Sequence, residues 1–196
     1  MADGGVQREV PGVAPPQRLT DRLFFAAHPN AEAARNIDRL AQGLHDELQL
    51  SGKPLGLARY HVTLIFLGDS AGIPQPLVDG VRGLAAQVTM APFQVAFDRV
   101  ESFRKRRDRA PVVLLGDDGV DGLLALREAI GRPFEEAGLM RLAPAFTPHL
   151  TLLYDVQRVE SVPIAPITWT VREFSLVHSL IGQSRHTVLE RWSLRG

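Results

Sequence analysis

A four-residue pattern, His–hydrophobic–Thr–Leu, occurs twice in the chain, at residues 61–64 (HVTL) and 149–152 (HLTL). Each copy lies in a short apolar run, 60–67 or 146–154, bounded by turn-forming residues, which is typical of a buried or half-buried strand. Successive side chains of a strand point to opposite faces, so the His and Thr of each copy share one face. A fold that pairs the two strands would bring two imidazoles and two hydroxyls into one cleft. These are groups that acid–base chemistry on a phosphate ester requires.

The composition places the chain among compact globular proteins. Its 196 residues, of which 45% are hydrophobic, suffice for one domain or for two small lobes that share a core. The absence of cysteine excludes disulfides, cysteine zinc sites and thiol nucleophiles. The formal net charge of zero gives no overall attraction to nucleic acid but leaves room for a local basic patch. Because no apolar run reaches the length of a membrane span, we expect a cytoplasmic protein with no membrane partner. We also expect a monomer.

The order of the elements follows from the spacing of the apolar residues. Residues 1–17 mix charged residues with Gly and Pro and are expected to form a loose N-terminal tail, which leaves 18–196 as a single two-lobed domain. The expected strands are 23–27, 60–67, 93–103, 111–115, 146–154, 167–171, 173–181 and 186–194. The expected helices begin at Asn30, Pro74 and Leu123, and the third is expected to kink or end near Gly131 and Pro133.

This order contains a repeat. The first strand, the first helix and the His61 strand are matched later by the strand 111–115, the third helix and the His149 strand. We therefore predict an α+β fold with two pseudo-symmetric lobes, in which mainly antiparallel sheets flank a central cleft and the helices lie on the outside. Each lobe contributes one motif strand to the cleft.

The chain resembles the two-histidine (2H) phosphoesterase superfamily. Within it, the chain is most similar to the RNA 2′,3′-cyclic phosphodiesterases, also called 2′-5′ RNA ligase-like proteins. The resemblance runs from about residue 18 to the C-terminus, and the segments that carry it are 22–26, 61–68, 146–152, 174–176 and 191–194. One His-x-Thr motif occurs often by chance, but two copies on predicted strands in equivalent halves are fairly specific.

The resemblance implies hydrolysis of a 2′,3′-cyclic phosphate, on an RNA end or a nucleotide, to a 2′-phosphate. It implies that His61 donates a proton, that His149 accepts one, and that Thr63 and Thr151 hold the non-bridging phosphate oxygens. It implies neither a metal nor a nucleotide cofactor. The same groups acting in reverse would join RNA ends through a 2′-5′ linkage.

Substrate-binding residues are less clearly marked. Relatives often place an Arg two residues beyond the second motif, where Tyr154 stands here, and Arg185 or the basic turn 104–109 is the candidate replacement. In that turn, Arg104, Arg106 and Arg107 either guide an RNA end through phosphate contacts or form a solvated hairpin tip.

Other histidines have weaker claims to function. His186 stands where relatives usually have Tyr, which makes it a candidate for substrate contact. His28 is expected in a surface turn, and His178 in the core or on a sheet face. Two histidines without further His or Cys at ligand spacing make a poor metal site, so no metal is predicted.

Three alternatives to an RNA-processing enzyme remain open at this stage. The cleft could recognise RNA ends without catalysis, the substrate could be a small cyclic nucleotide, or the protein could be structural with two incidental His-containing strands. Turnover without added metal separates the enzyme from the binding module. Histidines far apart in the fold would favour the structural protein.

Overall fold

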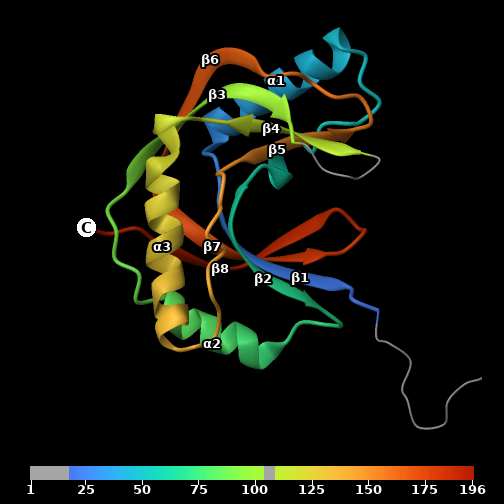
Figure 1. Ribbon diagram of the computed structural model, residues 1–196. Helices are drawn as coiled ribbons and strands as arrows, with labels where there is room; N and C mark the ends of the chain where they lie inside the picture. Colours follow the sequence, from blue (N-terminus) through green and yellow to red (C-terminus); the bar gives the residue numbers. More distant parts are fainter. Residues whose placement is uncertain (1–17, 104–108) are drawn as a thin grey trace, which may run out of the picture.

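The computed structural model describes residues 18–103 and 109–196. The expected tail, 1–17, and most of the basic turn, including Arg104, Arg106 and Arg107, lie outside these residues. The described chain forms an eight-stranded antiparallel sheet with three α-helices (Figure 1), which confirms the predicted α+β class. The strands are β1 (Asp21–Ala27), β2 (Val62–Ser70), β3 (Phe93–Ser102), β4 (Ala110–Leu115), β5 (Leu150–Asp155), β6 (Val162–Val171), β7 (Glu173–Leu180) and β8 (Arg185–Ser193), and the helices are α1 (Ala31–Glu47), α2 (Gln75–Ala85) and α3 (Asp121–Glu136).

Two similar halves make up the sheet. Its strand order is β6-β3-β4-β5-β2-β1-β7-β8, so the two motif strands, β2 and β5, are central neighbours. These two strands pair through one residue pair, Val62 and Leu150. In Figure 1 the half with β3, β4, β5 and β6 lies above the half with β1, β2, β7 and β8. The predicted lobes are therefore halves of one continuous sheet and not separate sheets.

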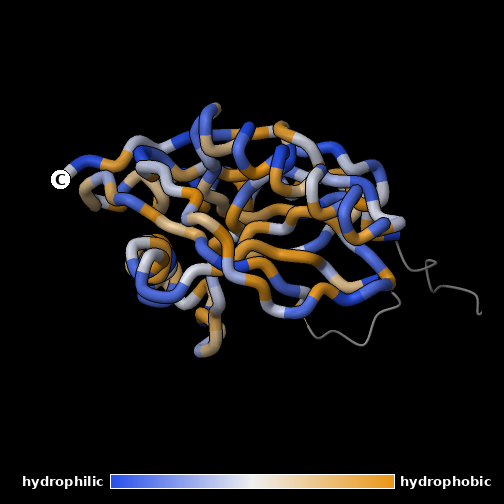
Figure 2. The backbone as a smooth tube through the Cα atoms, turned by 90° about the horizontal axis from the view of Figure 1, so that it is seen from above, coloured by the Kyte–Doolittle hydropathy of each residue, from blue (hydrophilic) through white to orange (hydrophobic). Residues whose placement is uncertain are grey.

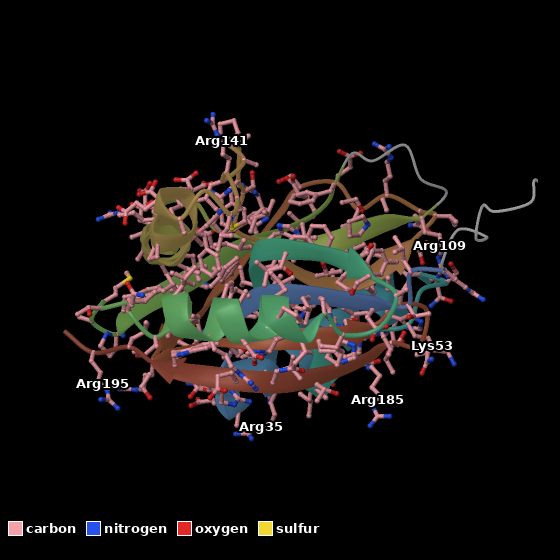
Figure 3. All side chains as sticks on the ribbon, turned by 90° about the horizontal axis from the view of Figure 1, so that it is seen from below. Arg35, Lys53, Arg109, Arg141, Arg185 and Arg195 are labelled. Carbon is pink, nitrogen blue, oxygen red and sulfur yellow. The ribbon has the colours of Figure 1, made fainter. Side chains whose placement is uncertain are left out.

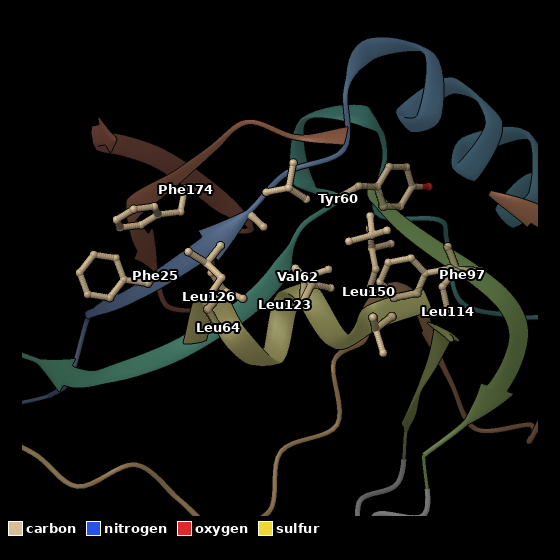
Figure 4. Close-up of a cluster of buried hydrophobic side chains, with 14 of the residues drawn as sticks. Phe25, Tyr60, Val62, Leu64, Phe97, Leu114, Leu123, Leu126, Leu150 and Phe174 are labelled. Carbon is tan, nitrogen blue, oxygen red and sulfur yellow. The ribbon is translucent and has the colours of Figure 1, made fainter. Parts of the chain in front are cut away.

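The helices tie the halves together. α1 follows β1 in the chain but packs against β5 and β6 of the other half, and α3 follows β4 but packs against β2 as well as β3. α2 lies against α3. One cluster of buried side chains therefore spans both halves, from Phe25 and Leu64 to Phe97 and Leu114 (Figure 4). Figure 2 shows apolar stretches along the inner strands and hydrophilic stretches at the outer turns.

Several predicted boundaries differ from the structure: β5, for example, begins at Leu150 and not at residue 146. Two further differences lie at prolines. α3 continues without interruption through Gly131 and Pro133 to Glu136. Pro133 lies in the last turn of the helix, where the one backbone hydrogen bond that it removes interrupts little further helix. β6 begins at Val162 and not at Ile167. It is an edge strand with β3 as its neighbour, and edge strands tolerate the prolines at 163 and 166.

The predicted start of the first helix is confirmed. The Asn30 side chain accepts a hydrogen bond from the backbone N–H of Ala33 at 2.8 Å, which caps α1.

In the part of the chain that the structure describes, no helix is both long enough and apolar enough to span a bilayer.

Candidate active site

The two motifs meet where the sheet halves join. Val62 and Leu150 face each other across β2 and β5. The histidine and threonine of each motif flank this pair on their own segment, so all four residues lie close to the point where the two halves join.

All four polar side chains line one cleft of about 320 Å³. The alternate residues of both motifs, Val62, Leu64, Leu150 and Leu152, are at most 2% exposed and belong to the buried core. Figure 4 shows the first three among the core side chains. Strand alternation produces this division between a polar and an apolar face. The structure therefore brings together the four side chains that the sequence repeat singles out.

The two imidazoles are held in the same way. His61 Nδ1 lies 2.7 Å from the carbonyl oxygen of Arg59, and His149 Nδ1 lies 2.8 Å from that of Thr147. A carbonyl oxygen only accepts hydrogen bonds, so Nδ1 carries a hydrogen and donates it in both rings. Nε2 is then the nitrogen that takes up or gives off a proton when either ring titrates.

His61 lies in an aromatic and basic environment. Its ring stacks on Phe24 at a centroid distance of 5.0 Å, with His186 at 5.1 Å and His28 at 6.2 Å. Burial lowers the pKa of His61 to about 4, and the nearby His186, His28 and Arg59 charges act in the same direction, against the hydrogen bond to the Arg59 carbonyl. In the free protein at neutral pH, His61 is therefore uncharged.

This lowered pKa predicts a pH-dependent stability. Between about pH 6.5 and pH 4 the unfolded chain protonates His61 whereas the folded chain does not, so the free energy of unfolding falls as the pH falls through this window. The His61→Asn variant should lose less stability than the wild type over the window, by about 1–2 kcal/mol. Urea unfolding of both proteins at several pH values measures the difference. Parallel curves of unfolding free energy against pH for the two proteins would contradict the burial of a neutral His61. The His45→Asn variant, outside the cleft, is the control for the loss of an imidazole.

Two arginines that the sequence analysis did not select line the cleft, Arg22 and Arg59. Arg22 Nε and an Nη donate to the two carboxylate oxygens of Asp69 at 2.7 and 2.9 Å, and its guanidinium lies 5.3 Å from the centre of the Phe66 ring. Arg59 ends a short 3₁₀ turn, Leu57–Arg59, two residues before His61. The position of Arg59 two residues before a motif histidine could have suggested a role in the cleft. A single turn, however, has no repeating pattern of apolar residues from which the direction of the Arg59 side chain could be predicted.

Of the predicted substrate-binding residues that the structure describes, only one lies in the cleft. Tyr154 lines the cleft and is 45% exposed. Arg185 does not line it but borders an adjacent hollow together with Arg59 and His186. Arg104, Arg106 and Arg107 lie outside the described residues. The far wall of the cleft comes from the turn between β7 and β8 and includes Ile181, Gly182 and Ser184.

The remaining histidines also differ in their placement. The prediction of a surface turn for His28 is wrong, because its ring is partly buried beside His61 and its Nε2 lies 2.9 Å from the Ser175 hydroxyl. The segment after β1 folds inward here, which a His-Pro sequence does not reveal. His178 is buried as expected and lies 2.5 Å from a carboxylate oxygen of Asp21. His186 lines the cleft.

A buried carboxylate fixes the end of the second motif strand. Asp155, at the end of β5, is 1% exposed and accepts hydrogen bonds from the Ser51 hydroxyl and from the backbone N–H groups of Gly52 and Gln157. Burial alone would raise the pKa of Asp155, but these donors outweigh it and keep the pKa below its usual value. The segments pack closely, since a Cβ on Gly52 would lie 1.9 Å from the Tyr154 carbonyl oxygen.

Replacing this carboxylate should destabilise the protein. Asp155→Ala leaves buried donors without an acceptor and should lower the free energy of unfolding by about 2–3 kcal/mol. Asp46→Ala, on the surface of α1, should change it by less than about 0.5 kcal/mol. Denaturant titrations of the two variants test the difference. Equal effects would show that Asp155 does not anchor the segment of Ser51 and Gly52 to the end of β5.

Histidines cluster in the cleft without forming a metal-ligand group. Across residues 18–103 and 109–196, no three His, Asp or Glu side chains are arranged as metal ligands would be. The cleft instead combines two imidazoles held at Nδ1, the hydroxyls of Thr63 and Thr151, and two guanidinium groups. Such a site can bind an anion and move protons on either side of it.

Comparison with known proteins identifies the family. A sequence profile of the 2′-5′ RNA ligase superfamily matches residues 28–182, which contain both motifs. The RNA 2′,3′-cyclic phosphodiesterase of Escherichia coli (strain K12) is 29% identical over 178 residues, covering 88% of this chain and 96% of that protein.

Solved structures give the same result. The crystal structure of E. coli LigT complexed with 3′-AMP superposes with a TM-score of 0.75 at 25% identity, covering 90% of this chain and 99% of LigT. The protein TT0787 of Thermus thermophilus superposes with a TM-score of 0.70 at 25% identity, covering 89% of this chain and 98% of TT0787. The family resemblance drawn from the two motifs is therefore confirmed, and the chain belongs to the 2′-5′ RNA ligase superfamily.

Proposed function

We propose that this protein hydrolyses 2′,3′-cyclic phosphates, on RNA ends or on nucleotides, to 2′-phosphates without a metal. One observation carries the proposal: two imidazoles, each held at Nδ1 by a backbone carbonyl, share one cleft with Thr63 and Thr151. The similarity to a protein named RNA 2′,3′-cyclic phosphodiesterase supports the choice of substrate. LigT, a protein of the same fold, has been crystallised with 3′-AMP, which supports a nucleotide-sized ligand.

In the proposed reaction, a water molecule attacks phosphorus and the bond from phosphorus to the 3′ oxygen breaks. His149 accepts the proton of the attacking water at Nε2, and His61 donates a proton from Nε2 to the departing 3′ oxygen. The hydroxyls of Thr63 and Thr151 donate hydrogen bonds to the non-bridging oxygens, where negative charge grows in the transition state. The net change is one water consumed and one phosphate bond opened, and the two rings exchange protonation states.

The donor role requires a protonated His61, although burial lowers its pKa to about 4 in the free protein. A bound cyclic phosphate carries a negative charge beside the ring and favours the imidazolium form, which raises this pKa. The substrate itself would therefore prepare the acid by favouring the protonated ring. The reverse reaction, 2′-5′ joining of RNA ends, would use the same two groups.

The substrate class is tested with matched substrates in the presence of a chelator. We expect turnover both of a short RNA that ends in a 2′,3′-cyclic phosphate and of a 2′,3′-cyclic mononucleotide, because both would present the same cyclic ester to the four motif side chains of the cleft. Chromatography of the products measures both rates. Binding of the RNA without turnover would replace the enzyme by an RNA-end-binding module. Turnover of the mononucleotide alone would identify a phosphodiesterase for small cyclic nucleotides.

A further inference from the structure

The cleft contains one positive charge that no carboxylate of the described chain neutralises. Of its two arginines, Arg22 is held by both oxygens of Asp69. Arg59 makes no side-chain hydrogen bond or ion pair with any residue that the structure describes, and its Nε is buried without a partner. Arg82 and Arg99 also have a buried Nε without a hydrogen bond, but each lies within 4 Å of carboxylates.

A buried donor without a partner costs folding free energy, so a native structure that keeps one calls for an explanation. An absent anionic ligand supplies one here, since Arg59 lines the same cleft as both motif histidines. A guanidinium group matches the geometry of a phosphate, to which it can donate two parallel hydrogen bonds.

The backbone holds Arg59 firmly at this position. The next residue, Tyr60, is 1% exposed, and its hydroxyl donates to a carboxylate oxygen of Asp38 in α1 at 2.9 Å. Tyr60 points into the core (Figure 4), and its two neighbours, Arg59 and His61, both line the cleft. The Arg59 carbonyl also accepts the Nδ1 hydrogen of His61. One residue thus orients the histidine through its backbone and places a cation beside it through its side chain.

The charge of Arg59 acts on the rings of the cleft. It contributes to the lowered pKa values of both His61 and His186, which places the guanidinium within electrostatic reach of both rings. An anion bound between Arg59 and these rings would reverse the effect. It would offset the guanidinium charge and favour the imidazolium form of His61.

We infer that Arg59 binds the reacting phosphate of the substrate. The identity of that phosphate as a 2′,3′-cyclic ester rests on the proposed function, whereas anion binding by Arg59 does not. Arg59 reaches the cleft from the turn before β2, on the side of the first motif, and supplies the charge from there.

The test measures binding of inorganic phosphate, by calorimetry, and competitive inhibition by phosphate of cyclic mononucleotide turnover. Arg59→Gln should weaken phosphate binding about 10- to 100-fold, the usual effect of losing a hydrogen bond to a charged group. Arg141→Gln removes the same charge from an exposed residue that does not line the cleft and that Figure 3 shows on the opposite side of the view from Arg185. This variant should leave the affinity within about twofold. An unchanged affinity in Arg59→Gln, or an equal loss in Arg141→Gln, would overturn the assignment.

A second variant separates lost charge from a disturbed fold. In Arg59→Gln/Tyr154→Arg, the new guanidinium enters the same cleft from β5, and phosphate affinity should recover at least in part. Recovery would show that the loss in Arg59→Gln is a loss of charge, whereas no recovery in a double variant that unfolds like the wild type would overturn the inference.

Phosphate binding requires no turnover, so the two hypotheses fail separately. An inactive wild type whose phosphate affinity depends on Arg59 would refute the proposed function alone. If the wild type is active but its affinity for phosphate and its inhibition by phosphate are unchanged in Arg59→Gln, this inference alone is refuted.

Discussion

Replacing either His61 or His149 by alanine should lower kcat on a 2′,3′-cyclic phosphate by about 10²–10⁴-fold, the usual contribution of a positioned acid or base. The double variant should lose much less than the product of the two single losses, because groups that act as one unit are not additive. Both rings are held at Nδ1 by carbonyl oxygens and line one cleft, so each is placed to serve the same phosphate.

Rates are to be compared among variants that unfold like the wild type, so that lost activity is not lost structure. His45→Ala, on α1 and outside the cleft, is the matched control and should keep wild-type kcat. A single variant at His61 or His149 that keeps more than half of the wild-type rate would exclude that ring as the acid or base.

Truncating the residue that joins the two sheet halves should affect both stability and activity. Leu150 is fully buried, pairs with Val62 between the halves, and stands between His149 and Thr151. Leu150→Ala should lower the free energy of unfolding by about 2–5 kcal/mol. It should also lower kcat about tenfold or more in the protein that remains folded, because small displacements of reacting groups are costly.

Leu126→Ala provides the matched comparison. Leu126 in α3 is equally buried and loses the same atoms, but its neighbours in the chain are not residues of the cleft. Its stability loss should fall in the same range while kcat stays near the wild-type value. Equal kcat values for the two variants would show that packing behind the motifs does not set the geometry of the cleft.

The cleft could be predicted from the sequence because its pattern is local. His and Thr two residues apart, on strands with buried alternate residues, fix which side chains share a face. The repetition of that pattern in equivalent halves predicts that two such faces meet, and β2 and β5 are indeed central neighbours. The N-cap at Asn30 was likewise local and is confirmed.

What the sequence did not reveal depends on contacts distant in the chain. No local pattern states that α1 covers the half of the sheet to which its own preceding strand does not belong. His28 is buried by its position against Ser175 and the His61 ring. The prolines of β6 are tolerated because that strand lies at an edge. Arg59 lines the cleft from a single turn, and the sequence does not show that its guanidinium lacks a carboxylate partner among the described residues.

The most direct test of two-histidine catalysis is the identity of the product formed from a 2′,3′-cyclic mononucleotide in the presence of excess chelator. Phosphorus NMR distinguishes the 2′-phosphate from the 3′-phosphate. We expect the wild type to form the 2′-phosphate at a rate that the chelator does not change, and the His61→Ala/His149→Ala variant to form almost none. A 3′-phosphate product, a rate that collapses on chelation, or a double variant as fast as the wild type would contradict the mechanism.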